Sequence, residues 1–204
     1  MDEMKNNNRL LLIGTPLQKP EPSHLARGKE FYSFPLEVVR LSGTSDKLNI
    51  LMSAEQLPEL VPSRAGLVEI DGELRSFNNR AGIGPRLVLS VLARGLYTPE
   101  RQEYENTVEL SGTLCRPPTH RMTPLGREIS DILLAVRRRY GRYDYIPCVV
   151  WGQQARECSG WDKGHSVRLT GRFQSREYTK LTEEGAQQRT AYEVSVAEIQ
   201  RTDE

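Results

Sequence analysis

The sequence predicts an all-β protein made of two tandem five-stranded barrels, each with one short helix. Two observations lead to this prediction. Landmarks of the chain recur 98 positions further on, and apolar residues alternate with polar ones in both copies. Length alone allows one large domain or two of about 100 residues. The repeat favours two, with residues 1–98 as a diverged first domain and residues 99–204 as the second.

The repeat rests on polar and glycine positions rather than on general similarity. At the same shift the matched pairs are Asn8 with Asn106, Gly14 with Gly112, Thr15 with Thr113, Gly28 with Gly126, Glu30 with Glu128, Gly43 with Gly141, Asp46 with Asp144 and Gly66 with Gly164. After one inserted residue, Gly72, Leu74 and Ser76 match Gly171, Phe173 and Ser175. Two unrelated segments are the alternative, and a chance match of so many landmarks at one shift is improbable.

The elements are clearest in the second copy. Alternation at Val108, Leu110 and Leu114 predicts the first strand. Turn signals such as Gly141 and the Ser159–Gly160 pair separate the later elements. In chain order these are a long strand over Ile129–Tyr140, a short one over Tyr145–Trp151, a helix over Gln153–Cys158, and strands over Val167–Ser175 and Ala191–Ile199.

Five strands with a helix between the third and the fourth is the order of the OB-fold. Gly112 and Gly171 lie inside strand patterns, where glycine often marks a sharp bend or bulge at a barrel corner. The sequence therefore predicts two tandem OB-fold barrels. A β-sandwich with the same number of strands remains the structural alternative.

Composition excludes several classes of function. The net charge of +1 is not that of a nonspecific duplex binder, so a nucleic-acid ligand would need local positive charge, as at Arg137–Arg139 and Arg142. Three cysteines without a C-x-x-C pair predict reduced thiols, with Cys148 in a buried strand, and no metal site. No phosphate loop, carboxylate pair or metal-ligand cluster suggests an enzyme or a cofactor. The polar start and the lack of a long apolar run predict a cytoplasmic protein.

The second copy, over about residues 105–200, resembles the bacterial single-stranded DNA-binding protein family. The resemblance rests on the segments Asn106–Gly112, Thr123–Gly126, Leu134–Val136, Asp144–Pro147, Val149–Gly152, Gly171–Arg176 and Arg189–Val196. It implies nucleoid-associated single-stranded DNA binding without catalysis, in replication, recombination or repair. It also implies a core of four OB folds, which a two-barrel chain reaches as a homodimer.

The resemblance implies base-stacking rings at Tyr140, Tyr145, Trp151 and Tyr178. Flat rings and a cationic groove are what single-strand binding without sequence choice requires. Trp151 lies in an apolar strand, so a core position is its alternative reading. Tyr140 and Tyr145 flank a turn, where a core position is harder to explain.

The arginines expected to bind nucleic acid are Arg137, Arg138, Arg139, Arg172 and Arg176. Strict alternation would send Arg138 inward, so a bulge or the barrel edge must release it. With Phe173 in the core, Arg172, Arg176 and Tyr178 share the outer face of their strand. For each surface arginine, a solvated charge is the alternative reading.

The first copy is poorer in these features. It has Val39-Arg-Leu-Ser42 where the second has Arg137–Tyr140, and we place Met52 at the Trp151 position. We therefore expect an architectural barrel that binds DNA weakly. An interaction module of a replication-restart complex, with DNA binding secondary, is the alternative function. RNA binding stays open, because stacking does not read the 2′-hydroxyl. The sequence ends at Glu204 without the family's usual acidic tail, so we expect no enzyme recruitment through such a tail.

Overall fold

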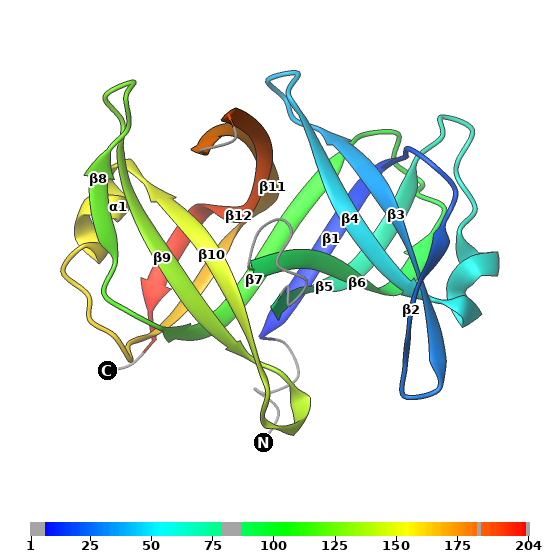
Figure 1. The fold of residues 1–204 in the computed structure, drawn as a ribbon, viewed down its shortest axis with the longest axis horizontal. Coiled ribbons are helices and arrows are strands. Elements are labelled where there is room, and N and C mark those ends of the chain that lie inside the picture. Colours follow the sequence, from blue (N-terminus) through cyan, green and yellow to red (C-terminus); the bar gives the residue numbers. More distant parts are fainter. Residues whose placement is uncertain (1–6, 79–86, 183–184, 203–204) are drawn as a thin grey trace. The chain divides into compact units, whose positions relative to one another are not determined.

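The computed structural model describes residues 7–78, 87–182 and 185–202 (Figure 1). The described chain divides into two compact units, each containing one barrel. One unit holds Leu10–Asn106 together with Gln174–Tyr192. The other holds residues 7–9, Thr107–Phe173 and residues 193–202.

The N-terminal barrel is a closed ring of five strands. Its strands are β1 (Asn8–Pro16), β3 (Lys29–Val39), β4 (Ser45–Ser53), β5 (Val68–Asn78) and β6 (Leu87–Tyr97). β1 pairs with both β3 and β5, which closes the ring, and β4 pairs with β6 in parallel. A short strand, β2 (Glu21–Ala26), extends the sheet beyond β3, and the 3-10 helix η2 (Ala54–Glu59) follows β4.

The C-terminal barrel has the same connections. Its strands are β7 (Glu105–Leu114), β9 (Glu128–Arg137), β10 (Tyr143–Trp151), β11 (Ser166–Thr182) and β12 (Gly185–Arg201). β7 pairs with β9 and β11, and the parallel pair is now β10 with β12. β8 (Thr119–Met122) flanks β9, η3 (Arg139–Gly141) precedes β10, and α1 (Gly152–Cys158) follows it.

This ring is the strand order of the OB-fold, so the predicted fold class is confirmed. A sandwich would leave two separate sheets, whereas the β1–β3 and β7–β9 pairings close each sheet on itself. The repeat also holds in backbone conformation. Gly43 and Gly141, for example, both have a positive φ, 82° and 75°.

Several boundaries differ from the sequence prediction. The long second strand, expected over Ile129–Tyr140, ends at Arg137 because Tyr140 adopts a positive φ of 67°. β8 was not predicted at all; its residues are exposed, so they carry no buried alternation to detect. The first barrel's helix is a 3-10 helix that contains Pro58, which cannot donate a backbone hydrogen bond.

Four strand glycines mark places where two backbones approach too closely for a side chain. A Cβ on Gly14 or Gly112 would lie 2.5 Å from the carbonyl oxygen of Glu37 or Ala135, where the first strand meets the second. A Cβ on Gly72 or Gly171 would lie 2.8 Å or 2.2 Å from the carbonyl oxygen of Leu92 or Ser195. The barrels therefore close only because these positions lack a side chain, and both copies share the requirement.

We predict that Gly112→Ala lowers the free energy of unfolding of the C-terminal barrel by about 1–3 kcal/mol, because the new methyl group overpacks a backbone crossing. Gly160→Ala is the matched control, since a Cβ there meets nothing within 4 Å. Its effect should stay within about 0.5 kcal/mol. Denaturant unfolding measures both, and equal midpoints for the two variants would contradict this account of closure.

Candidate nucleic-acid interface

A buried ion pair fixes the turn between β9 and β10. Asp144 is fully buried and accepts a 2.8 Å hydrogen bond at Oδ2 from Arg138 Nε, and its Oδ1 accepts a second bond from Arg138 Nη2. The backbone N–H of Arg138 donates to the Arg142 carbonyl at 2.7 Å. Arg138 therefore points inward, as the alternation of its strand requires, and its charge is paired with the buried Asp144 carboxylate. The structure gives this side chain a partner inside the barrel.

Three tyrosines project from this fixed turn. Tyr140 is 92% exposed, Tyr143 47% and Tyr145 45%. Tyr143 and Tyr145 are two residues apart on the outward face of β10, while Asp144 and Ile146 between and beyond them are buried. The sequence motifs predict ligand rings at Tyr140 and Tyr145 but not at Tyr143, which shares the outward parity of Tyr145 on β10.

Neighbours on β9 suit these rings to stacking. Tyr145 lies opposite Ala135, a small side chain, and Tyr143 lies opposite Arg137. Ring and guanidinium thus lie side by side on one surface. Arg137, Arg139 and Arg142 are all exposed. Among the described residues, no side-chain ion pair is found for Arg139 or Arg142, so their charge is available to an anionic ligand.

Trp151 lies at the other end of β10 and is both anchored and accessible. Its indole Nε1 donates a 3.0 Å hydrogen bond to Ser195 Oγ, and the side chain is half-buried. It also borders an open pocket of about 560 Å³. The other lining residues are Met122, Gly126, Arg127, Glu128 and Gly152.

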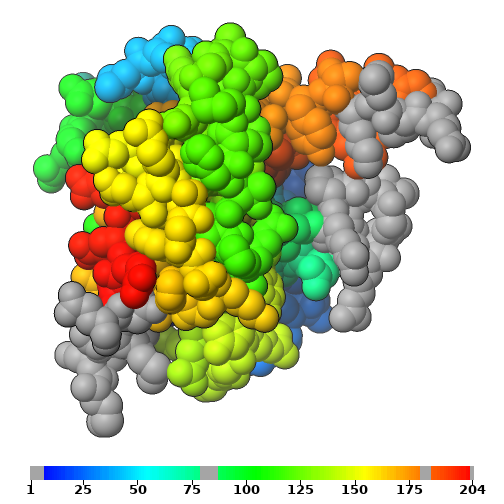
Figure 2. All heavy atoms as spheres, turned by 90° about the vertical axis from the view of Figure 1, so that its left-hand side faces the viewer, coloured from blue at the N-terminus to red at the C-terminus, as the bar shows by residue number. Residues whose placement is uncertain are grey.

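The pocket lies where the β8–β9 segment runs beside α1, the green and yellow segments of Figure 2. Exposed Met122 and Arg127 were not selected from the sequence, because only the β8–β9 pairing brings that segment to Trp151. Glu128, at the pocket wall, is held by Arg156, whose hydrogen bond lowers the pKa of the Glu128 carboxyl. The pocket therefore has an apolar ring, a thioether and an exposed cation on its wall.

The strand β11 carries the remaining predicted residues. Phe173 is fully buried, as expected, and Arg172 and Arg176 are exposed. The Arg176 guanidinium carbon lies 5.7 Å from the centre of the half-buried Tyr178 ring, a cation–π distance. Arg172 falls in the C-terminal unit, whereas Arg176 and Tyr178 fall in the unit that contains the N-terminal barrel.

Comparison with known proteins identifies the second barrel. A model of the single-strand binding protein family matches residues 105–202. Over these residues the chain is similar to the single-strand binding protein family. The resemblance expected from the sequence motifs is thereby confirmed for this half.

Individual relatives in the single-strand binding family are bacterial. Single-stranded DNA-binding protein 1 of Streptococcus agalactiae is 38% identical over 80 residues, which cover 36% of this chain and 49% of that protein. The single-stranded DNA-binding protein of Clostridium tetani is 38% identical over 80 residues, covering 36% of this chain and 55% of that one. The chain thus spans about half the length of the curated relatives it matches.

The two-barrel layout has a counterpart among solved structures. The wild-type single-stranded DNA binding protein of Thermus aquaticus superposes with a TM-score of 0.76, covering 97% of this chain and 93% of the other. A deletion mutant of that protein gives 0.74 over 97% and 95%. Sequence identity is 21% in both cases, so this likeness establishes the fold of the whole chain.

The N-terminal barrel has the same scaffold with a different surface. β4 and β10 share one burial pattern, and Ser53 pairs with Phe31 as Trp151 pairs with Ile129. The residue at the Trp151 position is therefore Ser53, and the sequence-based choice of Met52 was wrong by one residue. Met52 is instead a core residue. In the same register, Ser42, Ser45 and Lys47 occupy the positions of Tyr140, Tyr143 and Tyr145.

The described residues contain neither a metal-ligand cluster nor a cysteine with a lowered pKa. Within those residues no cluster of His, Cys, Asp or Glu is arranged to hold a metal ion. Burial raises the pKa of the thiols of Cys115, Cys148 and Cys158, which keeps all three protonated and poorly nucleophilic at neutral pH. No helix among the described residues is long and apolar enough to cross a membrane.

We predict that Arg138→Ala lowers the free energy of unfolding by about 3–5 kcal/mol, because it leaves the buried Asp144 carboxylate without its counter-charge. Arg139→Ala, the adjacent exposed arginine, should change it by less than about 0.5 kcal/mol. Chemical denaturation of the two variants measures the difference. A small effect at Arg138 would mean that the ion pair does not hold the turn.

Proposed function

We propose that this chain binds single-stranded DNA without sequence preference, by base stacking and phosphate contacts, in DNA replication, recombination or repair. The observation that carries the proposal is the turn between β9 and β10. Three exposed tyrosines and three exposed arginines project from a backbone that the Arg138–Asp144 pair holds in place. The match of residues 105–202 to the single-strand binding protein family supports a binding protein rather than an enzyme.

The position of these residues on the barrel supports the same ligand. OB-folds bind oligonucleotides on the face of their second and third strands and on the loops beside it. Here those strands are β9 and β10, and the outward rings of β10 run from Tyr143 to Trp151. At a rise of about 3.3 Å per residue, Tyr145 and Trp151 lie roughly 20 Å apart along the strand. That length accommodates several unstacked nucleotides.

Nonspecific binding follows from the chemistry of the side chains. Every base has a π-face, so aromatic rings accept any sequence, and guanidinium groups contact the backbone that all sequences share. We assign base stacking to Tyr140, Tyr145, Trp151 and Tyr178, with Tyr143 added by its parity. We assign phosphate contacts to Arg137, Arg139, Arg172 and Arg176, with Arg142 added. Arg138 stabilises the turn through its ion pair with Asp144 and is not assigned a contact with the ligand.

We assign the N-terminal domain, residues 1–98, an architectural role. Its counterpart positions carry Ser42, Ser45, Lys47 and Ser53, which offer no ring to a base. Residues 99–204 then form the DNA-binding domain. We further propose that two chains associate, so that a homodimer presents four OB folds.

Titration with oligo-dT of increasing length, read together with the solution mass, tests the function. We expect affinity to rise with length until the site is filled and to fall steeply with added salt, as counterions are released. Trp151 fluorescence should be quenched, with Trp161 as a constant background. Light scattering should give the mass of two chains.

Two controls accompany the titration. Equal affinity for a duplex of the same length would contradict the proposal. Oligo-rU of matched length decides whether the site separates DNA from RNA.

We expect Tyr145→Ala to weaken oligo-dT binding by about 5- to 150-fold, the equivalent of one lost stacking contact. Tyr97→Ala is the matched control, because Tyr97 is a 55% exposed tyrosine of the N-terminal barrel. It should bind as the unaltered chain does. If Tyr145→Ala combined with Trp151→Ala left DNA binding intact, the stacking mode would be wrong, and an assembly module with DNA binding secondary would be favoured.

A further inference from the structure

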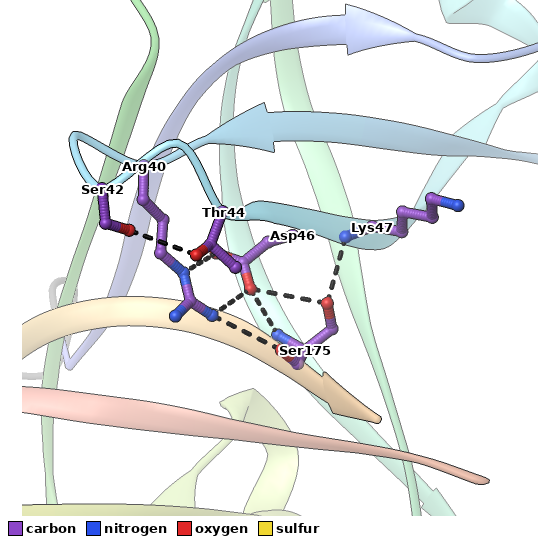
Figure 3. A network of polar contacts seen from close by, with 6 residues as sticks. All are labelled: Arg40, Ser42, Thr44, Asp46, Lys47 and Ser175. Atoms are coloured by element: carbon purple, nitrogen blue, oxygen red, sulfur yellow. Dashed lines mark hydrogen bonds and ion pairs between the residues drawn. The ribbon is translucent and has the colours of Figure 1, made fainter. Parts of the chain in front are cut away.

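The hairpin formed by β11 and β12 is hydrogen-bonded to the turn between β3 and β4 (Figure 3). Both segments belong to the same compact unit, which joins Leu10–Asn106 to Gln174–Tyr192. The contact is made by Ser175 of β11, which meets Asp46 and Lys47 at the start of β4. This is a specific latch, which we define as the hydrogen bonds among Arg40, Asp46, Lys47 and Ser175.

The latch centres on a fully buried carboxylate. Asp46 accepts from Arg40 at both oxygens, 2.7 Å at Oδ2 and 2.6 Å at Oδ1. Its Oδ1 also accepts from the backbone N–H of Ser175 at 2.8 Å and from its hydroxyl at 3.4 Å. Hydrogen bonds to an ionised acceptor are stronger than neutral ones. The ion pair that stabilises the first barrel therefore also holds the hairpin.

Two further bonds restrict the geometry of Ser175. Its carbonyl accepts from Arg40 Nη2 at 3.4 Å, and its Oγ accepts from the backbone N–H of Lys47 at 3.1 Å. The parallel pairing of β4 with β6 is at Ile50 and Leu51, so the Lys47 N–H lies before it and is satisfied by the serine. The N–H, carbonyl and hydroxyl of Ser175 are thus all engaged.

The residues that follow Ser175 are those assigned to the ligand. Arg176 comes next in the chain, and Tyr178, which its guanidinium covers, is two residues further on. Fixing Ser175 therefore fixes the direction in which this arginine–tyrosine pair leaves the barrel. A pre-organised site loses less conformational entropy when its ligand binds.

We propose that Asp46 and Ser175 are positioning residues for single-stranded DNA binding, through which the N-terminal barrel orients Arg176 and Tyr178 of the β11–β12 hairpin. The inference rests on the proposed function and gives the N-terminal barrel, which lacks the exposed rings of its partner barrel's turn, a role in DNA binding. The duplicated turn then serves two purposes. At Tyr140 and Arg142 the C-terminal copy presents a ring and a cation. The N-terminal counterparts, Ser42 and Thr44, are small polar residues that hydrogen-bond to each other at 3.3 Å, and the hairpin docks at the start of the strand that follows them.

The variant Ser175→Ala tests the latch, because it removes the two hydroxyl bonds and leaves both barrel cores intact. Ser166→Ala, at the start of the same strand, is the matched control. We expect oligo-dT affinity to fall about three- to tenfold in Ser175→Ala, as for the loss of one or two hydrogen bonds. Amide hydrogen exchange at residues 174–178 should accelerate, while the unfolding midpoint matches that of Ser166→Ala. Ser175→Thr, which keeps the hydroxyl, should restore affinity.

A double-mutant cycle separates positioning from a general structural effect. In a background that carries both Arg176→Ala and Tyr178→Ala, Ser175→Ala should cost little further affinity, because both side chains that it orients are gone. Additive losses would overturn the proposal. Hydrogen exchange needs no DNA, so unchanged exchange in Ser175→Ala overturns the latch whatever the titration gives. An unaltered chain that fails to bind oligo-dT overturns the proposed function, and the positioning role with it.

Discussion

The buried arginine–aspartate pair at the turn between the second and third strands is the interaction on which the rest of this structure depends. A carboxylate without water needs both a counter-charge and hydrogen bonds, so Asp46 and Asp144 each hold an arginine from the preceding strand end. The turn that joins the two residues then has one conformation. Whatever side chains it carries, rings in one barrel and small polar groups in the other, are presented from a fixed base.

Both barrels have glycine where two strands cross closely, and they differ at outward positions that do not affect barrel closure. Gly14 and Gly112 occupy the same crossing, and in each a Cβ would collide with the facing backbone. The outward positions of β4 and β10 are under no such constraint. There the residues diverge, with Lys47 in the place of Tyr145 and Ser53 in the place of Trp151. A shared scaffold can therefore carry a ligand face on one copy and a docking face on the other.

Trp151 illustrates why the choice between core and ligand residue can be a false one. Its indole N–H is bonded to Ser195 on a core strand, and its ring borders the pocket beside the β8–β9 segment. Anchoring one edge of the ring lowers the entropy lost when the other surface stacks on a base. Tyr140 shows the opposite arrangement, with almost complete exposure on a backbone of positive φ.

The sequence by itself determined the two barrels, their strand order and the shared outer face of Arg172, Arg176 and Tyr178, because alternation and turn glycines are local properties. It also placed Tyr140 and Tyr145 at a turn. Only the tertiary structure shows that Arg138 pairs with Asp144 and that Ser175 hydrogen-bonds to Asp46. It also shows that Met122 and Arg127 line the same pocket as Trp151. Some of these contacts link segments that are distant along the chain. The contact of Arg138 depends on the direction that its long side chain takes at the end of a strand. The alternation of apolar residues does not predict these contacts, because they form only when the sheets close and buried charges are paired.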